Sequence, residues 1–204
     1  MYIFGAGGHG KVVLDILLSK KETVIGFIDD NPAKKGKEVN GYKVFGDFNF
    51  IAKKKGVLLA LGIGDNQIRE RIYTRALEAG IKIVEAIHDK AVVSEYAKIG
   101  EGVVIMPGAV VNSSARLEEG VVVNTGSTVD HDCLLKRFCH IWPGAHLAGT
   151  VTVGEFSYVG TGASVIPNLK IGRNTTVGAG AVVIKDIPDN VTVVGVPACI
   201  KKKE

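Results

Sequence analysis

The chain has 204 residues, a formal net charge of +4 and 46% hydrophobic residues, with 26 glycines against two methionines and one tryptophan. The apolar fraction suffices for a folded core, and the small charge, part of which lies in the lysine run 201–203, argues against a nucleic-acid-binding protein. No apolar run approaches the ~20 residues that span a bilayer, and Met1 leads directly into a strand-like segment, so we expect a cytoplasmic protein without a membrane partner.

Residues 1–85 alternate short apolar runs with amphipathic stretches. This alternation is typical of βαβ units and predicts a small parallel sheet flanked by helices. We therefore expect an α/β, Rossmann-like domain over residues 1–85, with a polar loop at 30–41. The expected elements, in chain order, are a strand at 2–4, a helix at 9–19, a strand at 24–28, a strand at 57–61, a helix at 66–79 and a strand at 81–84.

A glycine-rich turn, GAGGHG at 5–10, follows the first expected strand, and Asp29 and Asp30 stand at the end of the next one. Glycines let the backbone approach a phosphate at the start of a helix, and the aspartates can accept hydrogen bonds from ribose hydroxyls. A second turn, GIGDN at 62–66, falls at the same edge of the sheet. Because nothing resembles a hydride-acceptor site, the pattern favours a nucleotide ligand without redox chemistry over a dehydrogenase.

From residue 87 onward every sixth residue is aliphatic. A period of six fits neither an α-helix nor a single strand and indicates a structural repeat. If each hexad forms one strand and one turn, three hexads close a coil, and successive coils pair at about 4.8 Å. We therefore predict a parallel β-helix over residues 86–204 rather than an antiparallel sandwich. The aliphatic positions are Ile87, Val93, Ile99, Ile105, Val111, Leu117, Val123, Val129, Leu135, Ile141, Leu147, Val153, Val159, Val165, Ile171, Val177 and Val183.

Polar residues interrupt the repeat most strongly at DHDC, residues 130–133. Acyl transfer from a thioester needs a base and a donor for the developing oxyanion, and a neutral histidine such as His131 can be the base at cellular pH. Asp132 can hold one ring nitrogen protonated, with Asp130 as the competing candidate. Gly149, one coil later in the same column, can present its N–H to the thioester carbonyl. Cys133 falls at an inward position, so we expect a core thiol and direct acyl transfer.

The motifs of both halves resemble one family in order and over nearly the whole chain. They are GAGGHG at 5–10, FIDD at 27–30, GIGDN at 62–66, NTG at 124–126, HDC at 131–133 and GVPA at 195–198. They resemble the hexapeptide-repeat sugar acetyltransferases, the group of bacillosamine-pathway and perosamine N-acetyltransferases and sialic acid O-acetyltransferases. The resemblance implies a left-handed β-helix, acetyl-CoA as co-substrate, and a homotrimer with active sites at subunit interfaces. It also implies N-acetylation of the 4-amino group of a nucleotide-linked 4-amino-4,6-dideoxy sugar, with O-acetylation of sialic acid or a related sugar as the alternative.

The same resemblance assigns roles to individual residues. His131 becomes the general base and Asp132 its partner, while Asn124 is a candidate for the acceptor site. The residues assigned to acetyl-CoA are His140, Gly149, Thr161 and Ala179. The residues assigned to the nucleotide sugar are Gly7, Gly8, His9, Asp29, Asp30, Gly64 and Asn66. The resemblance gives His146 no role, and it leaves the identity of the nucleotide and sugar open.

The sequence also allows two further interpretations. One branch of hexapeptide-repeat proteins binds zinc between subunits, but His131, His140 and His146 fall on different faces of a coil, so we expect no metal. The second interpretation is a scaffold without activity, and the clustered polar residues around His131 argue against it.

Overall fold

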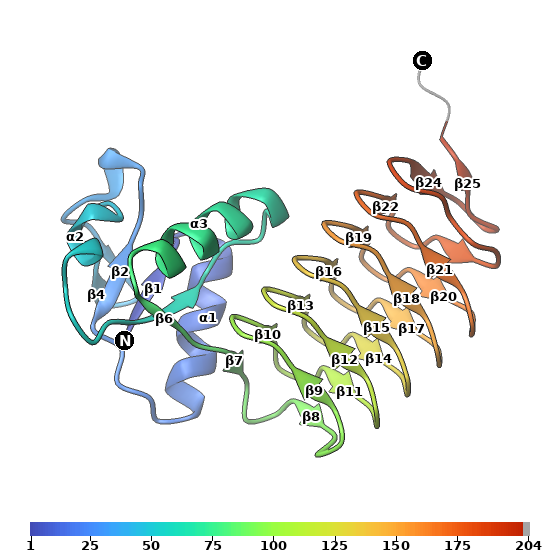
Figure 1. Ribbon diagram of the computed structural model, residues 1–204, viewed down its shortest axis with the longest axis horizontal. Coiled ribbons are helices and arrows are strands. Elements are labelled where there is room, and N and C mark those ends of the chain that lie inside the picture. The colour runs from blue at the N-terminus through green and yellow to red at the C-terminus, as the bar shows by residue number, and fades with distance from the viewer. Residues whose placement is uncertain (202–204) are drawn as a thin grey trace.

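The structure is a computed structural model that describes residues 1–201 (Figure 1). The elements before the repeats are β1 (Tyr2–Phe4), α1 (Gly8–Ser19), β2 (Gly26–Ile28), η1 (Pro32–Lys34), β3 (Glu38–Val39), β4 (Tyr42–Lys43), α2 (Asn49–Ala52), β5 (Leu58–Leu61), α3 (Asn66–Glu78) and β6 (Lys82–Ile83). Strands β2, β1, β5 and β6 form a parallel sheet in that order, which confirms the predicted Rossmann-like architecture. No helix in residues 1–201 combines the length and the apolar character needed to cross a bilayer.

The polar loop expected at 30–41 contains more structure than predicted. It begins with η1 and ends inside an antiparallel hairpin of β3 and β4. The hairpin turn is Asn40-Gly41, whose φ angles of 49° and 79° are both left-handed. An Asn-Gly pair between two short extended segments is a strong hairpin signal, so this turn was predictable from the sequence.

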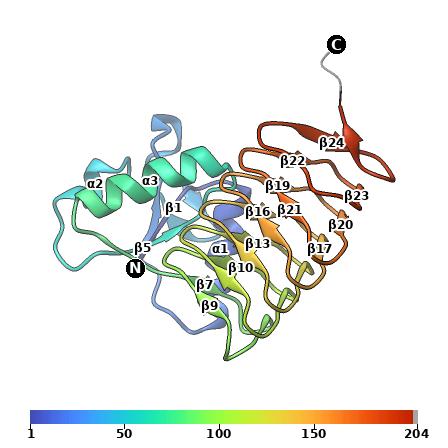
Figure 2. The ribbon, with the colours of Figure 1, turned by 45° about the vertical axis from the view of Figure 1, so that its right-hand side comes forward.

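From residue 86 the chain forms a β-helix (Figures 1 and 2). Its strands are β7 (Ala86–Ile87), β8 (Val92–Val93), β9 (Lys98–Ile99), β10 (Val104–Ile105), β11 (Val110–Val111), β12 (Arg116–Leu117), β13 (Val122–Val123), β14 (Thr128–Val129), β15 (Leu134–Leu135), β16 (His140–Ile141), β17 (His146–Leu147), β18 (Thr152–Val153), β19 (Tyr158–Val159), β20 (Ser164–Val165), β21 (Lys170–Ile171), β22 (Thr176–Val177), β23 (Val182–Val183), β24 (Thr192–Val194) and β25 (Cys199–Ile200). The repeat is the predicted one, while its left-handedness stays a prediction. The expected repeat domain and the lysine run extend to residues 202–204, which lie outside the described residues.

The coil strands build three sheets, one on each side of the β-helix. Sheet I has eight strands, from β7 and β10 to β24 and β25; sheet II has six, from β8 to β23; and sheet III has five, from β9 to β21. All neighbours pair in parallel except β24 with β25. Each strand pairs with its counterpart one coil later, as Val104 does with Val122 and Val122 with His140. Residues one coil apart therefore lie in one column.

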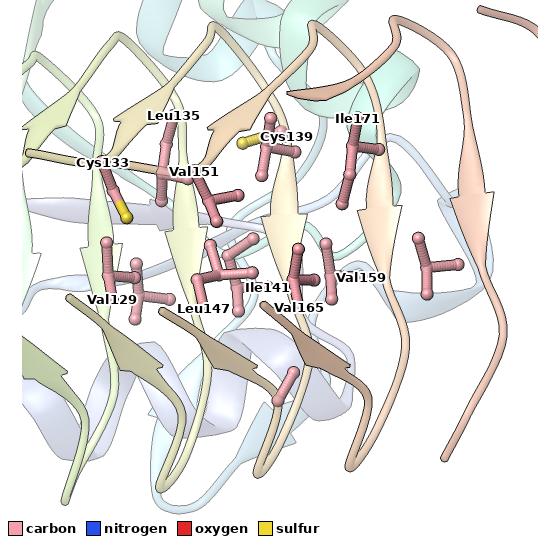
Figure 3. Close-up of a cluster of buried hydrophobic side chains, with 14 of the residues drawn as sticks. Val129, Cys133, Leu135, Cys139, Ile141, Leu147, Val151, Val159, Val165 and Ile171 are labelled. Carbon is pink, nitrogen blue, oxygen red and sulfur yellow. The ribbon is translucent and has the colours of Figure 1, made fainter. Parts of the chain in front are cut away.

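The second residue of each coil strand points inward, as the hexad pattern predicts. Val129, Leu147 and Val165 stack along one side of this core (Figure 3). Cys133 and Cys139 are also inside it, with exposed fractions of 1% and 0%, which confirms that Cys133 is a core thiol (Figure 3).

The N-terminal part docks on the first coils of sheet I (Figures 1 and 2). Residues Ala86, Val104 and Val122 on the outer side of this sheet are buried in a cluster with Leu14 of α1. Phe138, in the turn between sheets III and I, enters the second hydrophobic cluster of the N-terminal part. The next outward residues of sheet I after Val122 are His140 and Tyr158, so they come to lie at the edge of this interface.

Candidate active site

A cavity of about 510 Å³ lies at the carboxyl ends of β1, β2 and β5, beside α3. This is the edge where open α/β sheets bind ligands. Its walls include Gly5, Asp29, Asp30, Arg71 and Arg75. The two arginines were not predicted, although their spacing on the helix expected at 66–79 places them on one side. They supply positive charge where a nucleotide phosphate would be expected.

The glycines of the GAGGHG turn have two different functions. A Cβ on Gly10 would collide with the Gly5 carbonyl, and a Cβ on Gly5 would lie 2.5 Å from the Gly62 oxygen, so these two are needed for packing. Gly7 and Gly8 have open space around the Cβ position. Gly7 is the N-cap of α1 and has no side-chain cap, so the first N–H groups of the helix are available to an anion.

Asp29 is held by the loops around the cavity. Its Oδ2 accepts from the Ala6 N–H at 2.8 Å and from Lys34 Nζ at 2.7 Å, and its Oδ1 accepts from the Asn31 N–H at 3.0 Å. Burial alone would raise the pKa of Asp29, but these hydrogen bonds, led by that from Lys34, lower it below its usual value. The carboxylate therefore fixes the glycine-rich turn, and both of its oxygens already accept hydrogen bonds from the protein.

Asp30 lies at the rim of the same cavity. Its Oδ1 accepts from the Phe48 N–H at 3.0 Å, and its Oδ2 lies 2.7 Å from Arg75 Nη1. Both partners of this ion pair are about two fifths exposed, so a ligand can reach and rearrange them.

Four of the predicted residues meet where the N-terminal part contacts sheet I. His140 Nδ1 lies 3.2 Å from the Gly64 carbonyl, its Nε2 lies 3.0 Å from Asn124 Nδ2, and its ring packs edge-on against His9 at a centroid distance of 5.8 Å. A carbonyl only accepts, so Nδ1 carries the proton and Nε2 accepts from the Asn124 amide. Burial, followed by the positive charge of Arg69, lowers the pKa of His140 to about 3 and that of His9 to about 4. Both rings are therefore neutral at cellular pH.

This arrangement bears on the assignment of His140 to acetyl-CoA, which stays a prediction. The residue is 4% exposed, and within this chain both ring nitrogens have a partner, Gly64 and Asn124. The structure groups His140 with His9, Gly64 and Asn124, the residues predicted for the sugar and the acceptor. The sequence placed it on the β-helix but could not show which face the N-terminal part covers.

The side chain of Asn66 also makes its hydrogen bonds within the chain. It is fully buried, donates to the Phe156 and Ser157 carbonyls at 3.0 and 3.3 Å, and accepts from Arg69 Nη2 at 2.7 Å. Its backbone N–H donates to the Tyr158 hydroxyl at 2.9 Å. Asn66 therefore joins α3 to the β-helix, and its assignment to the nucleotide sugar stays a prediction.

His131 lies in the turn between sheets II and III, and its neighbours fix its ring. Nδ1 is 2.9 Å from Asp132 Oδ2, which makes Asp132 rather than Asp130 the partner of the ring. Asp130 Oδ1 accepts from the His131 N–H and from Asn112 Nδ2, both at 2.8 Å, and so holds the turn. The hydrogen bond to Asp132, and then the charges of the two aspartates, raise the pKa of His131 above its usual value despite the opposing effect of burial.

Gly149 lies directly against the His131 ring. A Cβ at residue 149 would be 2.5 Å from both Cε1 and Nε2 of His131, so only glycine leaves the ring its present position. Within residues 1–201 the Gly149 N–H has no hydrogen-bond acceptor, whereas its carbonyl accepts from Asn168. A base and a free N–H donor are thus neighbours in successive coils.

Thr161 and Ala179 lie on a different corner, in the turns between sheets I and II. They line a cavity of about 370 Å³ together with Gly64, Trp142 and Tyr158. The residues predicted for acetyl-CoA are therefore divided between this corner and the His131 corner. His146 is exposed on sheet II, with Nδ1 3.0 Å from Thr128 Oγ1.

No group of three or more His, Cys, Asp or Glu side chains in residues 1–201 is arranged to hold a metal ion.

Comparison with protein families gives two matches along the chain. Residues 1–76 match the PglD N-terminal domain, and residues 96–131 and 150–185 match the bacterial transferase hexapeptide repeat. Among curated proteins, a GDP-perosamine N-acetyltransferase of Escherichia coli is 32% identical over 112 residues. A UDP-N-acetylbacillosamine N-acetyltransferase of Bacillus subtilis is 38% identical over 109 residues. Each match covers about half of this chain and 50% of the relative.

Two solved structures match over nearly their whole length. PerB of Caulobacter crescentus, in complex with CoA and GDP-perosamine, is 43% identical with a TM-score of 0.93, over 98% of this chain and 96% of that chain. The acetyltransferase domain of PglB from Neisseria gonorrhoeae, in complex with acetyl coenzyme A, is 42% identical with a TM-score of 0.92, over 98% of both chains.

Proposed function

Because the chain belongs to the hexapeptide-repeat sugar acetyltransferase family with a PglD-type N-terminal domain, we propose that it is an acetyl-CoA-dependent N-acetyltransferase. Its acceptor is the 4-amino group of a nucleotide-linked 4-amino-4,6-dideoxy sugar. Residues 1–85 bind the nucleotide sugar, residues 86–204 supply the transfer chemistry, and the enzyme works in the cytoplasm. The observation that carries this proposal is the His131–Asp132 pair, packed against Gly149 of the next coil.

The acceptor side has the groups that a nucleotide sugar requires. The free N–H groups at Gly7 and Gly8 begin α1, and the cavity at the same sheet edge is bordered by Asp30, Arg71 and Arg75. A diphosphate is stabilised by a helix N-terminus and by guanidinium groups. The nucleotide therefore binds at this edge, and the amino sugar extends from it toward the β-helix.

The transfer step follows from the geometry at His131. The sugar amine attacks the thioester carbonyl carbon, and His131 Nε2 removes the amine proton as the C–N bond forms. Asp132 keeps the proton on Nδ1 and stabilises the imidazolium, while the Gly149 N–H donates to the developing oxyanion. The C–S bond then breaks, and the CoA sulfur takes the proton from the His131 imidazolium and leaves as the thiol, which regenerates the base. Cys133 is buried, and burial raises the pKa of its thiol, which supports direct transfer without an acyl-cysteine.

We further propose that the enzyme is a homotrimer whose active sites lie between subunits. His131 and Gly149 lie in turns between sheets II and III. The cavity proposed for the nucleotide lies in the N-terminal part, which packs on sheet I, and Thr161 lies in a turn between sheets I and II. One chain thus presents the base and the acceptor pocket on different sides of the β-helix. A second copy can bring its acceptor pocket to the His131 corner of the first.

The same base could deprotonate a hydroxyl, so O-acetylation of sialic acid is the alternative activity. The curated relatives named above are both N-acetyltransferases, which favours nitrogen as the acceptor.

The test is thiol release from acetyl-CoA with GDP-perosamine, UDP- and dTDP-linked 4-amino sugars, and free sialic acid. The wild type, His131→Ala and the matched control His146→Ala, an exposed histidine of the neighbouring sheet, are compared. We expect turnover with one amino sugar, retained in His146→Ala and lost in His131→Ala. Turnover with sialic acid alone would replace the proposal by its alternative, and full activity of His131→Ala would remove this histidine as the base.

A further inference from the structure

Arg69 of α3 is completely buried and has no carboxylate partner within residues 1–201. Its five N–H groups are matched by five contacts with neutral oxygens. The acceptors are the Gly120 carbonyl at 2.7 Å from Nε, the Ile63 and Gly64 carbonyls at 3.0 and 3.1 Å from Nη1, and Asn66 Oδ1 and the Phe138 carbonyl at 2.7 and 3.1 Å from Nη2.

A buried cation of this kind is costly for the fold. Burial lowers the pKa of Arg69 to about 10, so the group is still charged at cellular pH. Replacing buried charges by apolar side chains is often neutral or stabilising, so stability alone does not explain an arginine at this position. The contribution of Arg69 must therefore lie in the groups that its guanidinium holds in place.

The five acceptors come from three separate parts of the chain. Ile63 and Gly64 form the turn after β5, where Ile63 lines the 510 Å³ cavity and Gly64 the 370 Å³ cavity, and Asn66 begins α3. Gly120 and Phe138 lie one coil apart in turns between sheets III and I. A planar fork with fixed donor directions can set the relative positions of these parts in a way that a flexible side chain cannot.

The Gly64 carbonyl links this fork to the rest of the acceptor side. It accepts from Arg69 Nη1 and lies 3.2 Å from His140 Nδ1. His140 Nε2 then accepts from Asn124 Nδ2, and Asn124 Oδ1 accepts from the Thr125 N–H at 2.8 Å. Each of these hydrogen bonds allows the next group only one favourable orientation. The orientation of the Asn124 amide therefore depends on Arg69 of α3, through Gly64 and His140.

We propose that Arg69 is a positioning residue for acceptor binding: it fixes the turn 62–64 against two coils of the β-helix and thereby sets the orientation of His140 and Asn124. The inference deepens the proposed function, because the acceptor is the nucleotide-linked amino sugar. Arg69 contacts neither substrate and acts through the Gly64 carbonyl.

The test compares wild type with Arg69→Lys and Arg69→Met, and uses Tyr73→Phe as the matched control. Tyr73 also lies in α3, and its hydroxyl donates to Glu101 of the β-helix at 3.1 Å, so Tyr73→Phe loses a contact between the same two parts without touching residues 62–64. Heteronuclear NMR of the histidine rings, with His140→Gln for assignment, reports the state of His140 without any substrate. Kinetics with GDP-perosamine, or the amino sugar that the wild type turns over, give the two KM values.

We expect His140 of the wild type and of Tyr73→Phe to remain in the Nδ1–H form at pH 6. In Arg69→Met it should become a mixture of tautomers and titrate closer to the ordinary value of about 6.5. The KM for the amino sugar should rise about tenfold or more, as expected when a binding group moves by about 1 Å. Gly64 also borders the cavity of Thr161 and Ala179, so the KM for acetyl-CoA should rise too, but by less. In Arg69→Lys the changes in the His140 signal and in the KM for the amino sugar should both be smaller than in Arg69→Met.

An unchanged His140 spectrum in folded Arg69→Met or Arg69→Lys would overturn the proposal, as would equal changes in both KM values. If Arg69→Met does not fold, Arg69→Lys decides by the same two readouts. The NMR result does not require turnover. A protein without acetyltransferase activity but with an altered His140 signal would therefore refute the proposed function and leave the role of Arg69 in positioning His140 intact.

Discussion

The imidazole of His131 and the Cα of Gly149 in the next coil are so close that a Cβ on Gly149 would lie 2.5 Å from the ring nitrogen Nε2. The backbone of Gly149 has no left-handed φ, so alanine is sterically allowed there apart from this contact. We expect Gly149→Ala to displace the ring from the position in which it meets the acceptor amine. The kcat should fall about 100-fold, with a change of less than about 1 kcal/mol in the free energy of unfolding.

Gly108→Ala is the control for this substitution. Gly108 lies in an earlier turn, where an added Cβ meets only ordinary contacts, the nearest at 3.9 Å, but its φ of 71° strains alanine. This variant should lose about 1–2 kcal/mol of stability and keep its kcat. Equal kcat values for Gly149→Ala and wild type would show that the ring does not depend on this contact.

The hydrogen bond that His131 Nδ1 donates to Asp132 raises the pKa of His131, which sets the pH at which the base becomes neutral and active. In Asp132→Asn the pKa of His131 should fall, so the acid limb of the pH profile of kcat/KM should move to lower pH. The plateau should drop at least about tenfold, because asparagine stabilises the imidazolium less. Asp130→Asn should move the acid limb less, since Asp130 contacts the backbone N–H of His131. A larger shift in Asp130→Asn would reverse the assignment of the two aspartates.

The hexad pattern predicted which residues of the β-helix point inward, because every coil repeats the same steric requirement. Residues such as Val129 and Leu147 are therefore buried as expected. No such pattern predicts which outward residues of sheet I are buried, because their burial depends on contacts with the N-terminal part. His140 continues the column of Val104 and Val122, which the N-terminal part covers, and no local pattern shows where that cover ends.

Two contacts between the parts had sequence signals that can be recognised after the fact. Phe138 occupies a turn position that is glycine one coil earlier, at Gly120, and its φ of 54° is left-handed. A large aromatic side chain at such a position indicates an external contact. Arg69 shares the buried face of α3 with Ile72 and Ala76, and a charged residue on an apolar helix face indicates a buried polar network.

Phe138→Ala tests the docking of the N-terminal part on the β-helix. The Phe138 ring is fully buried, packs edge-on against Tyr73 at 5.3 Å and stacks on Phe156 at 5.9 Å between ring centroids. Removing it should cost about 3–5 kcal/mol of unfolding free energy. Calorimetry should show the N-terminal part melting before the β-helix. Phe156→Ala, which removes a half-buried ring of the same stack, should cost less, and equal losses would contradict this view of the interface.

The buried histidines His9 and His140 predict that stability falls in mild acid. Their pKa values in the folded protein are about 4 and about 3, whereas unfolded histidine titrates near 6.5. The unfolded state therefore binds more protons below pH 6.5, and each histidine removes about 1.4 kcal/mol per pH unit until its folded pKa is reached. Urea unfolding between pH 6 and pH 5 measures this slope. His140→Gln should reduce this slope by the contribution of one histidine, about 1.4 kcal/mol per pH unit. An unchanged slope would mean that His140 is protonated in the folded protein.

Complementation between two inactive variants tests whether the active site is shared between subunits. His131→Ala removes the base and leaves the acceptor pocket, while Gly7→Asp places a carboxylate at the N-cap of α1, where it caps the helix and repels a diphosphate. Each variant alone should be inactive. In a cyclic trimer with each site built from two neighbours, every mixed trimer regains one of its three sites, so random mixing should restore about a quarter of wild-type activity. If base and pocket instead belonged to one chain, every site in the mixture would lack one of them, and co-expression would restore none.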